Sequence, residues 1–348
     1  MSAVGSSNPG YVVARVRARR GQLYGDEEYR KLVRMSPAEI ARFMEESTYE
    51  SAINALGSRH GGVDLVEYAL NQNLAVQFEA ILEWSEGELY DLVARYLRKF
   101  DAWNLKTVIR GVYTGASREA VEADLIRAGE FDDRQIRRLL DADSIEAVVE
   151  AAEETIYDEP LQAAYPAFEE SDVLVPLENA VDRAFYDRLL TGLPGGEPVR
   201  QYEAFLEAEV DFRNAANALR LARSGAEIDP AEYFIDGGQL FTRTSLARLA
   251  RNLDELVEYV AGSQYADDLG PALRELEEAD SLIAFEQATD AALLAYADKL
   301  GTIHPVSVTP VISYILAKER EVENIRAIAR GKEAGLSADA IESELVIT

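Results

Sequence analysis

The sequence has 348 residues, a formal net charge of -28 and no cysteine, and 48% of its residues are hydrophobic. This length and hydrophobic fraction suffice for a globular protein with a sizeable core. The lack of cysteine excludes disulfides, thiolate metal sites and cysteine nucleophiles. A surface this acidic repels nucleic acid and anionic lipid, so we expect neither as a direct partner.

The charge also indicates the environment. There are 63 acidic residues against 35 Lys and Arg, and lysine is rare. This balance favours a salt-loving microbe, because screening cuts the range of self-repulsion to about 3 Å near 1 M salt. An acidic protein from an ordinary cytosol is the alternative. No apolar run approaches the roughly 20 residues that span a bilayer, and the start does not resemble a signal peptide. We expect a soluble, intracellular protein, at most peripheral to a membrane.

The chain begins with an expected flexible tail, residues 1–10. A helix with its valines on one side is predicted from Tyr11 to the glycine Gly21. A short helix follows from Glu28 to Arg34. Ser36 and Pro37 then supply an N-cap and a first-position proline, which predict the start of a third helix.

Three landmarks recur further along the chain. The first is a tyrosine that is followed four residues later by Ile or Leu, and it repeats in steps of 108 residues. The second is a Glu-x-Ala unit at the start of an apolar helix. The third is an acidic residue followed at fixed spacings by Asn, Arg and Gly, which repeats in steps of 110 residues. The copies are Tyr49, Tyr157 and Tyr265; Glu67, Glu178 and Glu286; and Asp101/Asn104/Arg110/Gly115, Asp211/Asn214/Arg220/Gly225 and Glu321/Asn324/Arg330/Gly335.

Ordered landmarks in three copies indicate duplication of a unit of roughly 110 residues. Each unit is predicted to hold a helix to the Tyr, a helix from the Glu, a long Asn/Arg helix, a Gly stop and a short helix. The short helices have N-cap signals at Ser117, Asp229 and Ser337. In the third copy, the long helix is the stretch Pro310–Lys332.

Strand signals are weak throughout, so we predict an all-α fold. We expect a single chain of three pseudo-threefold-related helical modules: residues 11–130, 131–240 and 241–348. The period is too long for an ordinary helical solenoid. Tyr165–Val175 and Gly192–Pro198 are interpreted as the longest loops.

The residues of the Asn/Arg helices predict their own environment. The acid and the Asn lie on one face, and an apolar triplet after each Asn forms a buried stripe. The Arg lies nine residues past the acid, on the opposite side, so each must find a partner on another helix, module or protein. We favour bridging of helices within a module over a docking surface. The repeated glycines are interpreted as helix stops, and the repeated tyrosines as half-buried packing residues with satisfied hydroxyls.

Catalytic patterns are sparse. His60 and His304 have no neighbours that suggest a metal site or a general base. The acidic pairs Asp132-Asp133 and Asp267-Asp268 are expected on the solvated surface, since adjacent helix residues diverge. We therefore predict no catalytic, cofactor-binding or metal-binding residue. An all-α, Mg²⁺-dependent enzyme that uses acidic pairs on facing helices is the alternative hypothesis.

Four segments carry a family resemblance: Tyr-Val-Val-Ala-Arg-Val-Arg-Ala at 11–18, Tyr29-x-x-Leu-Val-x-Met35, Asp101-x-x-Asn-Leu-x-x-x-x-Arg-Gly111 and Pro310–Lys332. Together they resemble the C subunits of archaeal A-type ATP synthases, along with the bacterial equivalents and the d subunits of vacuolar ATPases. The resemblance covers about residues 9–348. The middle copy departs most, because Leu221 replaces the glycine of the other two.

The resemblance implies a funnel-shaped, all-helical, non-catalytic subunit of the central stalk. Such a subunit would couple the membrane proteolipid ring (c/K) to the rotor shaft subunits D and F for proton-driven ATP synthesis. It would be held peripherally at the cytoplasmic face of the cell membrane by protein contacts within the A-type ATP synthase complex. The nine repeated Glu, Asn and Arg residues are expected at module joints or at partner contacts.

Overall fold

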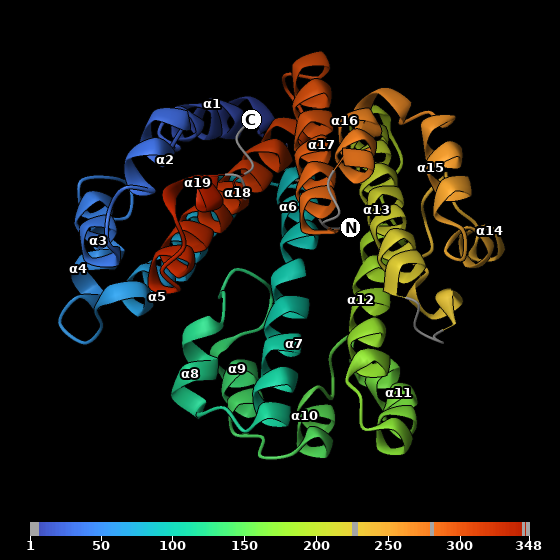
Figure 1. Ribbon diagram of the computed structural model, residues 1–348, viewed down its shortest axis with the longest axis horizontal. Coiled ribbons are helices and arrows are strands. Elements are labelled where there is room, and N and C mark those ends of the chain that lie inside the picture. Colours follow the sequence, from blue (N-terminus) through green and yellow to red (C-terminus); the bar gives the residue numbers. More distant parts are fainter. Residues whose placement is uncertain (1–6, 225–228, 279–281, 343–344, 346–348) are drawn as a thin grey trace. The chain divides into compact units, whose positions relative to one another are not determined.

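The computed structural model describes residues 7–224, 229–278, 282–342 and 345, and this part of the chain contains helices and no β-strand. The all-α prediction is thus confirmed. The chain divides into two compact units, residues 1–151 with 311–348, and residues 152–310. Both units are built of helices (Figure 1), and each contains buried apolar side chains.

The first unit joins the N-terminal half of the chain to its C-terminal helices, so the two ends of the sequence share one body. Its elements are α1 (Pro9–Arg20), α2 (Asp26–Leu32), α3 (Pro37–Glu45), α4 (Glu50–Leu56), α5 (Gly62–Trp84), α6 (Glu88–Leu97), α7 (Lys99–Thr114), α8 (Arg118–Asp124), α9 (Asp133–Leu140), α10 (Ile145–Ala151), α18 (Thr309–Glu333) and α19 (Ala338–Glu342).

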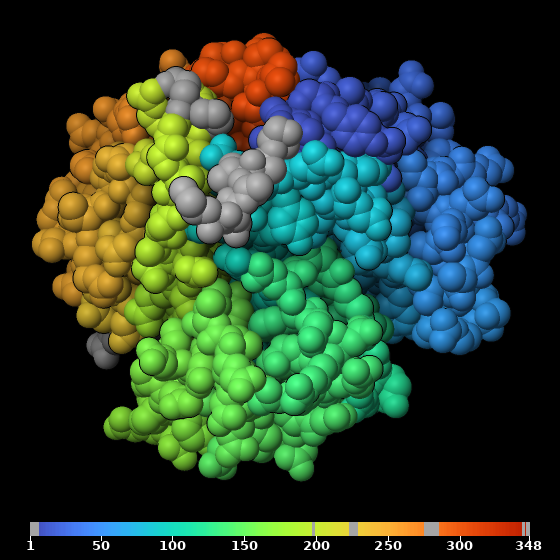
Figure 2. Space-filling model, turned by 180° about the vertical axis from the view of Figure 1, so that it is seen from behind, coloured from blue at the N-terminus to red at the C-terminus, as the bar shows by residue number. Residues whose placement is uncertain are grey.

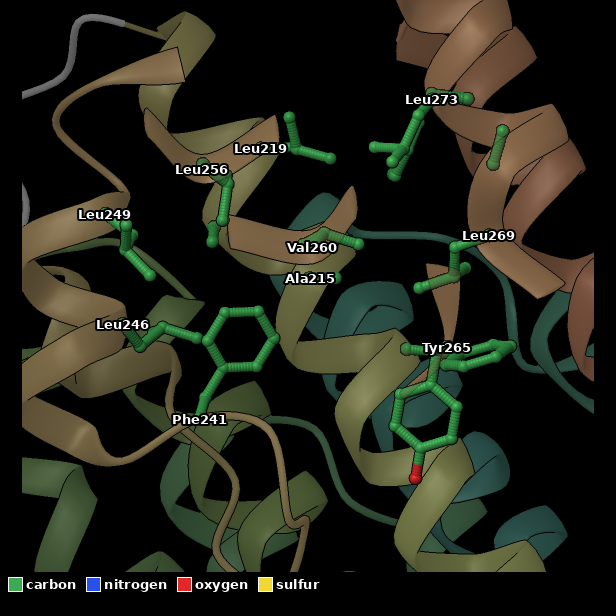
Figure 3. Packing of buried hydrophobic residues seen from close by; sticks show 14 of the residues in the cluster. Ala215, Leu219, Phe241, Leu246, Leu249, Leu256, Val260, Tyr265, Leu269 and Leu273 are labelled. Carbon is green, nitrogen blue, oxygen red and sulfur yellow. The ribbon is translucent and has the colours of Figure 1, made fainter. Parts of the chain in front are cut away.

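The second unit is a continuous stretch of chain. Its elements are α11 (Asp158–Ser171), α12 (Val175–Leu190), α13 (Glu197–Ser224), η1 (Pro230–Tyr233), α14 (Arg243–Leu249), α15 (Leu253–Ala261), α16 (Ala266–Glu278) and α17 (Leu282–Ile303). Figure 3 shows apolar side chains from α13 to α16 directed at one another, with Leu219, Leu246, Leu256 and Leu269 all at most 1% exposed.

The predicted N-terminal helices form as expected, with small shifts at their ends. α1 begins at Pro9, two residues before the expected start, and its valines Val12, Val13 and Val16 are buried. α2 lies two residues earlier than predicted. α3 starts after Ser36, whose backbone N–H and hydroxyl both donate to the Glu39 carboxylate at 2.8 Å. The bond from the backbone N–H of Ser36 satisfies a donor that the helix itself leaves unpaired.

One predicted loop is wrong. Residues 158–171 form α11, with Pro166 inside it, whereas Tyr165–Val175 was interpreted as a loop. A proline removes one helical hydrogen bond. Here the freed carbonyl belongs to Gln162, an exposed residue, so water can take the place of the missing donor. The second predicted loop is shorter than expected, since α13 starts at Glu197.

The long helices α7 and α18 end close to the glycines that were predicted to stop them. Gly115 and Gly335 have φ of 68° and 75°, a left-handed conformation in which a Cβ is strained. Gly225 lies outside the described residues. The short elements that follow are capped by Ser117, Asp229 and Ser337, each accepting from a backbone N–H two or three residues on.

The odd middle copy has a steric explanation. A Cβ on Gly331 would lie 2.8 Å from Ile341, and one on Gly111 would clash with Val121. These glycines therefore let α19 and α8 pack directly on their long helices. The middle copy has Leu221 at this position, and the element that follows is the short 3₁₀ turn η1 rather than an α-helix. Close packing of a helix is not required there.

None of the helices in the described residues combines the length and the apolar character needed to cross a bilayer.

Candidate functional site

The acid and the Asn of α7 together fasten the loop that follows α8. Asp101 accepts from the backbone N–H groups of Glu130 at 2.8 Å and Phe131 at 3.0 Å. The Asn104 amide donates to the carbonyl of Ile126 and accepts from its N–H, both at 2.8 Å. Both side chains are buried. Each backbone group of Ile126 thus has a partner without any strand being formed.

The same clamp recurs on α13. Asp211 accepts from the N–H groups of Gln239 at 2.8 Å and Leu240 at 2.9 Å. Asn214 donates to the carbonyl of Ile235 at 2.8 Å and accepts from its N–H at 3.0 Å. The two copies agree in donors and acceptors, and the offset from the Asn to its Ile partner differs by one residue, 22 against 21. These bonds also explain why the positions hold an acid and an Asn. The carboxylate accepts from two backbone N–H groups, and the amide both donates to and accepts from the backbone of one residue.

Two glycines complete these clamps, and we did not predict them from the sequence. A Cβ on Gly129 would clash with the Asp101 carboxylate, and one on Gly238 would clash with that of Asp211. Only glycine lets the loop backbone approach the carboxylate this closely. The signal that could have revealed them is a further match, Ile126-x-x-Gly129 against Ile235-x-x-Gly238, one residue short of the 110-residue step.

Burial opposes the charge on both acids. It raises the pKa of Asp101 to about 7, although the N–H groups of Glu130 and Phe131 act in the opposite direction. Burial likewise raises the pKa of Asp211, again against backbone hydrogen bonds that lower it. Desolvation is the larger effect in each case. These carboxylates face fixed backbone donors, so their arrangement serves to hold a loop.

The third copy, on α18, has a different clamp. Lys318 donates to the Tyr49 hydroxyl at 2.8 Å and to Glu321 at 3.2 Å, and the Tyr49 hydroxyl donates to Glu321 at 2.7 Å. The Lys318 ammonium also lies 4.0 Å from the centre of the Tyr49 ring. All three side chains are at most 2% exposed. Burial lowers the pKa of Lys318, and the Glu321 charge opposes that change.

Asn324 lies one turn further along α18 and is 3% exposed. Its side chain forms a hydrogen bond with the hydroxyl of Tyr29. Burial raises the pKa of Tyr29, and this hydrogen bond opposes that change. In α7 and α13, the acid holds backbone N–H groups of a loop. In α18, the acid holds side chains of the N-terminal segment instead. The polar clamp of the third copy therefore ties two distant parts of the sequence into one unit.

The repeated Arg and Glu pair with one another across copies. Arg330 makes a two-point contact with Glu67, through Nε to Oε1 and through Nη2 to Oε2 at 3.1 Å. In the second unit, Arg220 Nε and Nη2 reach Glu286 Oε1 at 3.0 and 2.6 Å. Each pair joins an Asn/Arg helix to a Glu helix, α18 to α5 and α13 to α17.

Both helix pairs run antiparallel. Along α5 and α18, Gln77 meets Tyr314 at 3.1 Å while Glu67 meets Arg330. Along α17 and α13, the rings of Tyr296 and Phe212 lie 6.4 Å apart while Glu286 meets Arg220. The Arg220 and Arg330 side chains are 53% and 59% exposed. Glu286 is 37% exposed, and exposed pairs contribute about 0–1 kcal/mol, so the Arg220–Glu286 contact marks the register more than it stabilises the helix pair. Glu67 is only 12% exposed, so the bonds from Arg330 also satisfy a largely buried carboxylate.

The remaining landmarks lie on the corresponding helices. Glu178 is in the first turn of α12, and Arg110 lies on an exposed face of α7. The repeated tyrosines Tyr49, Tyr157 and Tyr265 are 0, 1 and 4% exposed, so the expectation of half-burial was wrong. Their rings fill apolar space within the helical layers, and only the hydroxyl requires a polar neighbour.

The acidic pairs have ordinary roles. Asp132 caps α9 by accepting from Gln135 N–H at 2.8 Å, and Asp133 pairs with Arg127 at 2.7 Å. Asp268 lies 3.8 Å from Lys299. Across the part of the chain that is described, no three His, Asp or Glu side chains converge as a metal site would. Asp132, Asp133 and Asp268 have partners within the chain, and the alternative of a Mg²⁺ enzyme has no support.

Comparison with known proteins decides the family. The model of the ATP synthase (C/AC39) subunit family matches residues 12–344, nearly the whole chain. The chain belongs to the ATP synthase (C/AC39) subunit family. It is 82% identical to the C subunit of the A-type ATP synthase of Halorubrum lacusprofundi and 70% identical to that of Haloferax volcanii, over the full length of both. It is 35% identical to the corresponding C subunit of Methanococcoides burtonii, covering 98% of this chain and 95% of the relative.

The high-identity relatives come from halophiles, in agreement with the environment predicted from the net charge of -28. The family is that of a synthase subunit that is structural and not catalytic. The repeated polar side chains of α7, α13 and α18 thus belong to a component of a larger complex. Their observed bonds hold helices and loops of the chain itself.

Proposed function

We propose that the chain is the central-stalk subunit of an A-type ATP synthase that couples the membrane proteolipid ring to the rotor shaft subunits D and F. In this role, it passes torque between proton flow and ATP synthesis and catalyses nothing itself. It is held at the cytoplasmic face of the cell membrane by protein contacts. The observation that carries the proposal is the family match over residues 12–344, together with relatives named as this subunit over their full length.

The polar clamps support a mechanical role. A torque-bearing part must keep its helices in fixed register, and packing of apolar side chains alone allows sliding between near-equivalent positions. The Asn104 and Asn214 clamps use geometry-specific hydrogen bonds to buried backbone groups, and unmaking such bonds is costly. The clamps therefore hold the loops that follow α8 and η1 in fixed positions on α7 and α13.

We further propose that the three copies are related by a pseudo-threefold operation and together form a funnel. Matching clamps on α7 and α13, and matching antiparallel Arg–Glu pairs on α18/α5 and α13/α17, support this arrangement. In this proposal, the nine repeated Glu, Asn and Arg residues act first at module joints. Their contribution to contacts with the shaft or the ring comes second.

The proposal is tested by purifying the tagged chain from native membranes at high salt. Co-migration with nucleotide-binding subunits, the shaft subunits and the proteolipid ring is the expected result. Mild dissociation should release the chain together with ring or shaft components. A chain that migrates alone from intact membranes and turns over a substrate in the presence of Mg²⁺ would refute the role.

A further inference from the structure

Helix α1 is basic in an otherwise acidic chain. Residues 1–25 contain no Asp or Glu, although the chain has 63 acidic residues. α1 carries Arg15, Arg17, Arg19 and Arg20, and no acidic residue lies in its first turn. Basic and acidic residues are mixed along most of the remaining sequence. Adaptation to high salt favours acidic residues, so it does not explain why this helix is basic.

α1 is held firmly on α5. The Asn8 amide donates to the carbonyl of Trp84 at 2.9 Å and accepts from the N–H of Glu86 at 3.0 Å. Arg19 donates to the carbonyl of Gln77 at 3.2 Å. Together with the buried valines, these bonds fix the rotation of α1 about its axis. The side chains on its outer side are thus presented in one orientation.

Aromatic rings hold two of the guanidinium groups in place. The Cζ atom of Arg15 lies 4.7 Å from the ring centroid of Tyr11 and 4.7 Å from that of Trp84. The Cζ atom of Arg19 lies 4.2 Å from the Trp84 ring. Stacking occupies the faces of a guanidinium and leaves its N–H edge for a planar carboxylate. Arg15 is therefore pre-organised to receive an anion.

The outermost arginines have no acidic partner in the part of the chain that the structure describes. Arg15 and Arg17 are exposed, and neither forms an ion pair within the described residues. Elsewhere on the surface, arginines such as Arg127 and Arg220 do find carboxylates of this chain. The acidic side chains are numerous, so leaving Arg15 and Arg17 unpaired suggests a partner outside the chain.

The exposed side of α1 has the shape of a helix-packing surface. Tyr11, Ala14, Arg15 and Ala18 are all exposed and follow the i, i+3, i+4, i+7 spacing of one stripe. We name these four residues the α1 outer stripe. Its two alanines leave room for another helix to approach to about 8–10 Å between axes. Figure 2 shows the dark-blue N-terminal segment at the surface of the molecule.

We propose that the α1 outer stripe is a docking site for an acidic helix of another protein, whose carboxylates pair with Arg15 in the stripe and with Arg17 beside it. Arg suits this task because its fork of N–H groups matches a carboxylate at two points. A lipid surface fits less well. The valines of α1 are buried and leave no large aliphatic side chain to insert among acyl chains, and a net charge of -28 opposes approach to an anionic plane. This inference goes beyond the proposed function, which requires no contact at α1.

The test uses the chain in its native membrane-bound complex, at the salt concentration of growth. Ala18 is replaced by the photo-crosslinking amino acid p-benzoylphenylalanine, and the adduct is identified by mass spectrometry. The expected adduct is a protein segment rich in Asp and Glu. Arg15→Glu with Arg17→Glu in the same background should lower its yield by about tenfold or more, since like charges across an interface repel.

A matched control separates this effect from net charge. Arg134→Glu with Arg137→Glu changes two exposed arginines of α9 by the same amount and should leave the yield unchanged. Arg15→Lys with Arg17→Lys should keep part of the adduct yield that the two Glu substitutions in α1 remove. Circular dichroism of each variant checks folding. An adduct with lipid, no adduct with protein, or a yield that the α1 and α9 variants change equally would overturn the proposal.

Discussion

Removing the Asn104 amide tests the clamp on α7. Asn104→Ala leaves the N–H of Ile126 without its partner and removes one of two bonds to the Ile126 carbonyl, which still accepts from the N–H of Ala128 at 2.9 Å. Ile126 itself is only 4% exposed. An orphaned buried polar group costs about 1–3 kcal/mol. The stranded N–H and the lost bond to the carbonyl together give an expected loss of about 2–4 kcal/mol in the free energy of unfolding. This is a large share of the roughly 5–15 kcal/mol that stabilises a typical protein.

The assay is urea unfolding followed by circular dichroism at constant high salt. Asn214→Ala should lose a similar amount, because its clamp has the same donors and acceptors. Asn217→Ala is the control. It removes one bond from a partly buried position, to the Tyr233 carbonyl at 3.1 Å, and should cost about 1 kcal/mol.

Hydrogen exchange gives a local measure of the same clamp. In Asn104→Ala, the amide of Ile126 should exchange roughly 30-fold faster or more, which corresponds to about 2 kcal/mol of lost protection. The amide of Ile235, held by the separate clamp on α13, should serve as an internal reference. If Asn104→Ala costs under about 1 kcal/mol and leaves Ile126 exchange unchanged, the clamp does not hold the loop.

Three further outcomes follow from the buried clamps. Gly129→Ala should destabilise by about 1–3 kcal/mol because the added Cβ meets the Asp101 carboxylate, whereas Gly195→Ala, with open space around it, should stay within about 0.5 kcal/mol in the same urea titration. Lys318→Met strands the buried Glu321 charge and should cost about 3–5 kcal/mol, and adding Glu321→Met should recover most of that loss; equal losses in single and double variants would contradict the coupling. The folded pKa of Asp101, about 7, exceeds the unfolded 3.8, so its contribution to stability is full below pH 3.8 and is lost as pH rises towards 7. The free energy of unfolding of the wild type, relative to that of Asp101→Asn, should therefore fall by up to about 1.4 kcal/mol per pH unit across that window. A difference that does not change with pH would argue against the raised pKa of Asp101.

The repeat made much of the fold predictable from the sequence. The apolar triplets after each Asn are buried, with Leu105, Ala215 and Ile325 at most 1% exposed. The Gly stops at Gly115 and Gly335 have the left-handed backbone that their position predicts. These features depend on local periodicity and on backbone sterics, and a single sequence contains both.

The partners of the polar residues were not predictable in the same way. Periodicity showed that Arg330 must pair outside its own helix, but not that Glu67, far away in the sequence, would receive it. The α11 helix was missed because the prediction treated Pro166 as a helix breaker. The carbonyl that this proline leaves without a donor is exposed, so water can satisfy it and the helix continues. Buried Lys318 was missed too, since its partner Tyr49 becomes a neighbour only when the two ends of the sequence share one unit.

The central claim is that this chain turns with the rotor as a non-catalytic connector. The chain has no native cysteine, so one introduced cysteine can be cross-linked within the intact synthase to a shaft subunit or to a stationary subunit. We predict that a bond to the shaft leaves proton-driven ATP synthesis close to the uncross-linked rate, while a bond to a stationary subunit abolishes it. Loss of synthesis on bonding to the shaft, or full synthesis when the chain is bonded to a stationary subunit, would contradict the claim.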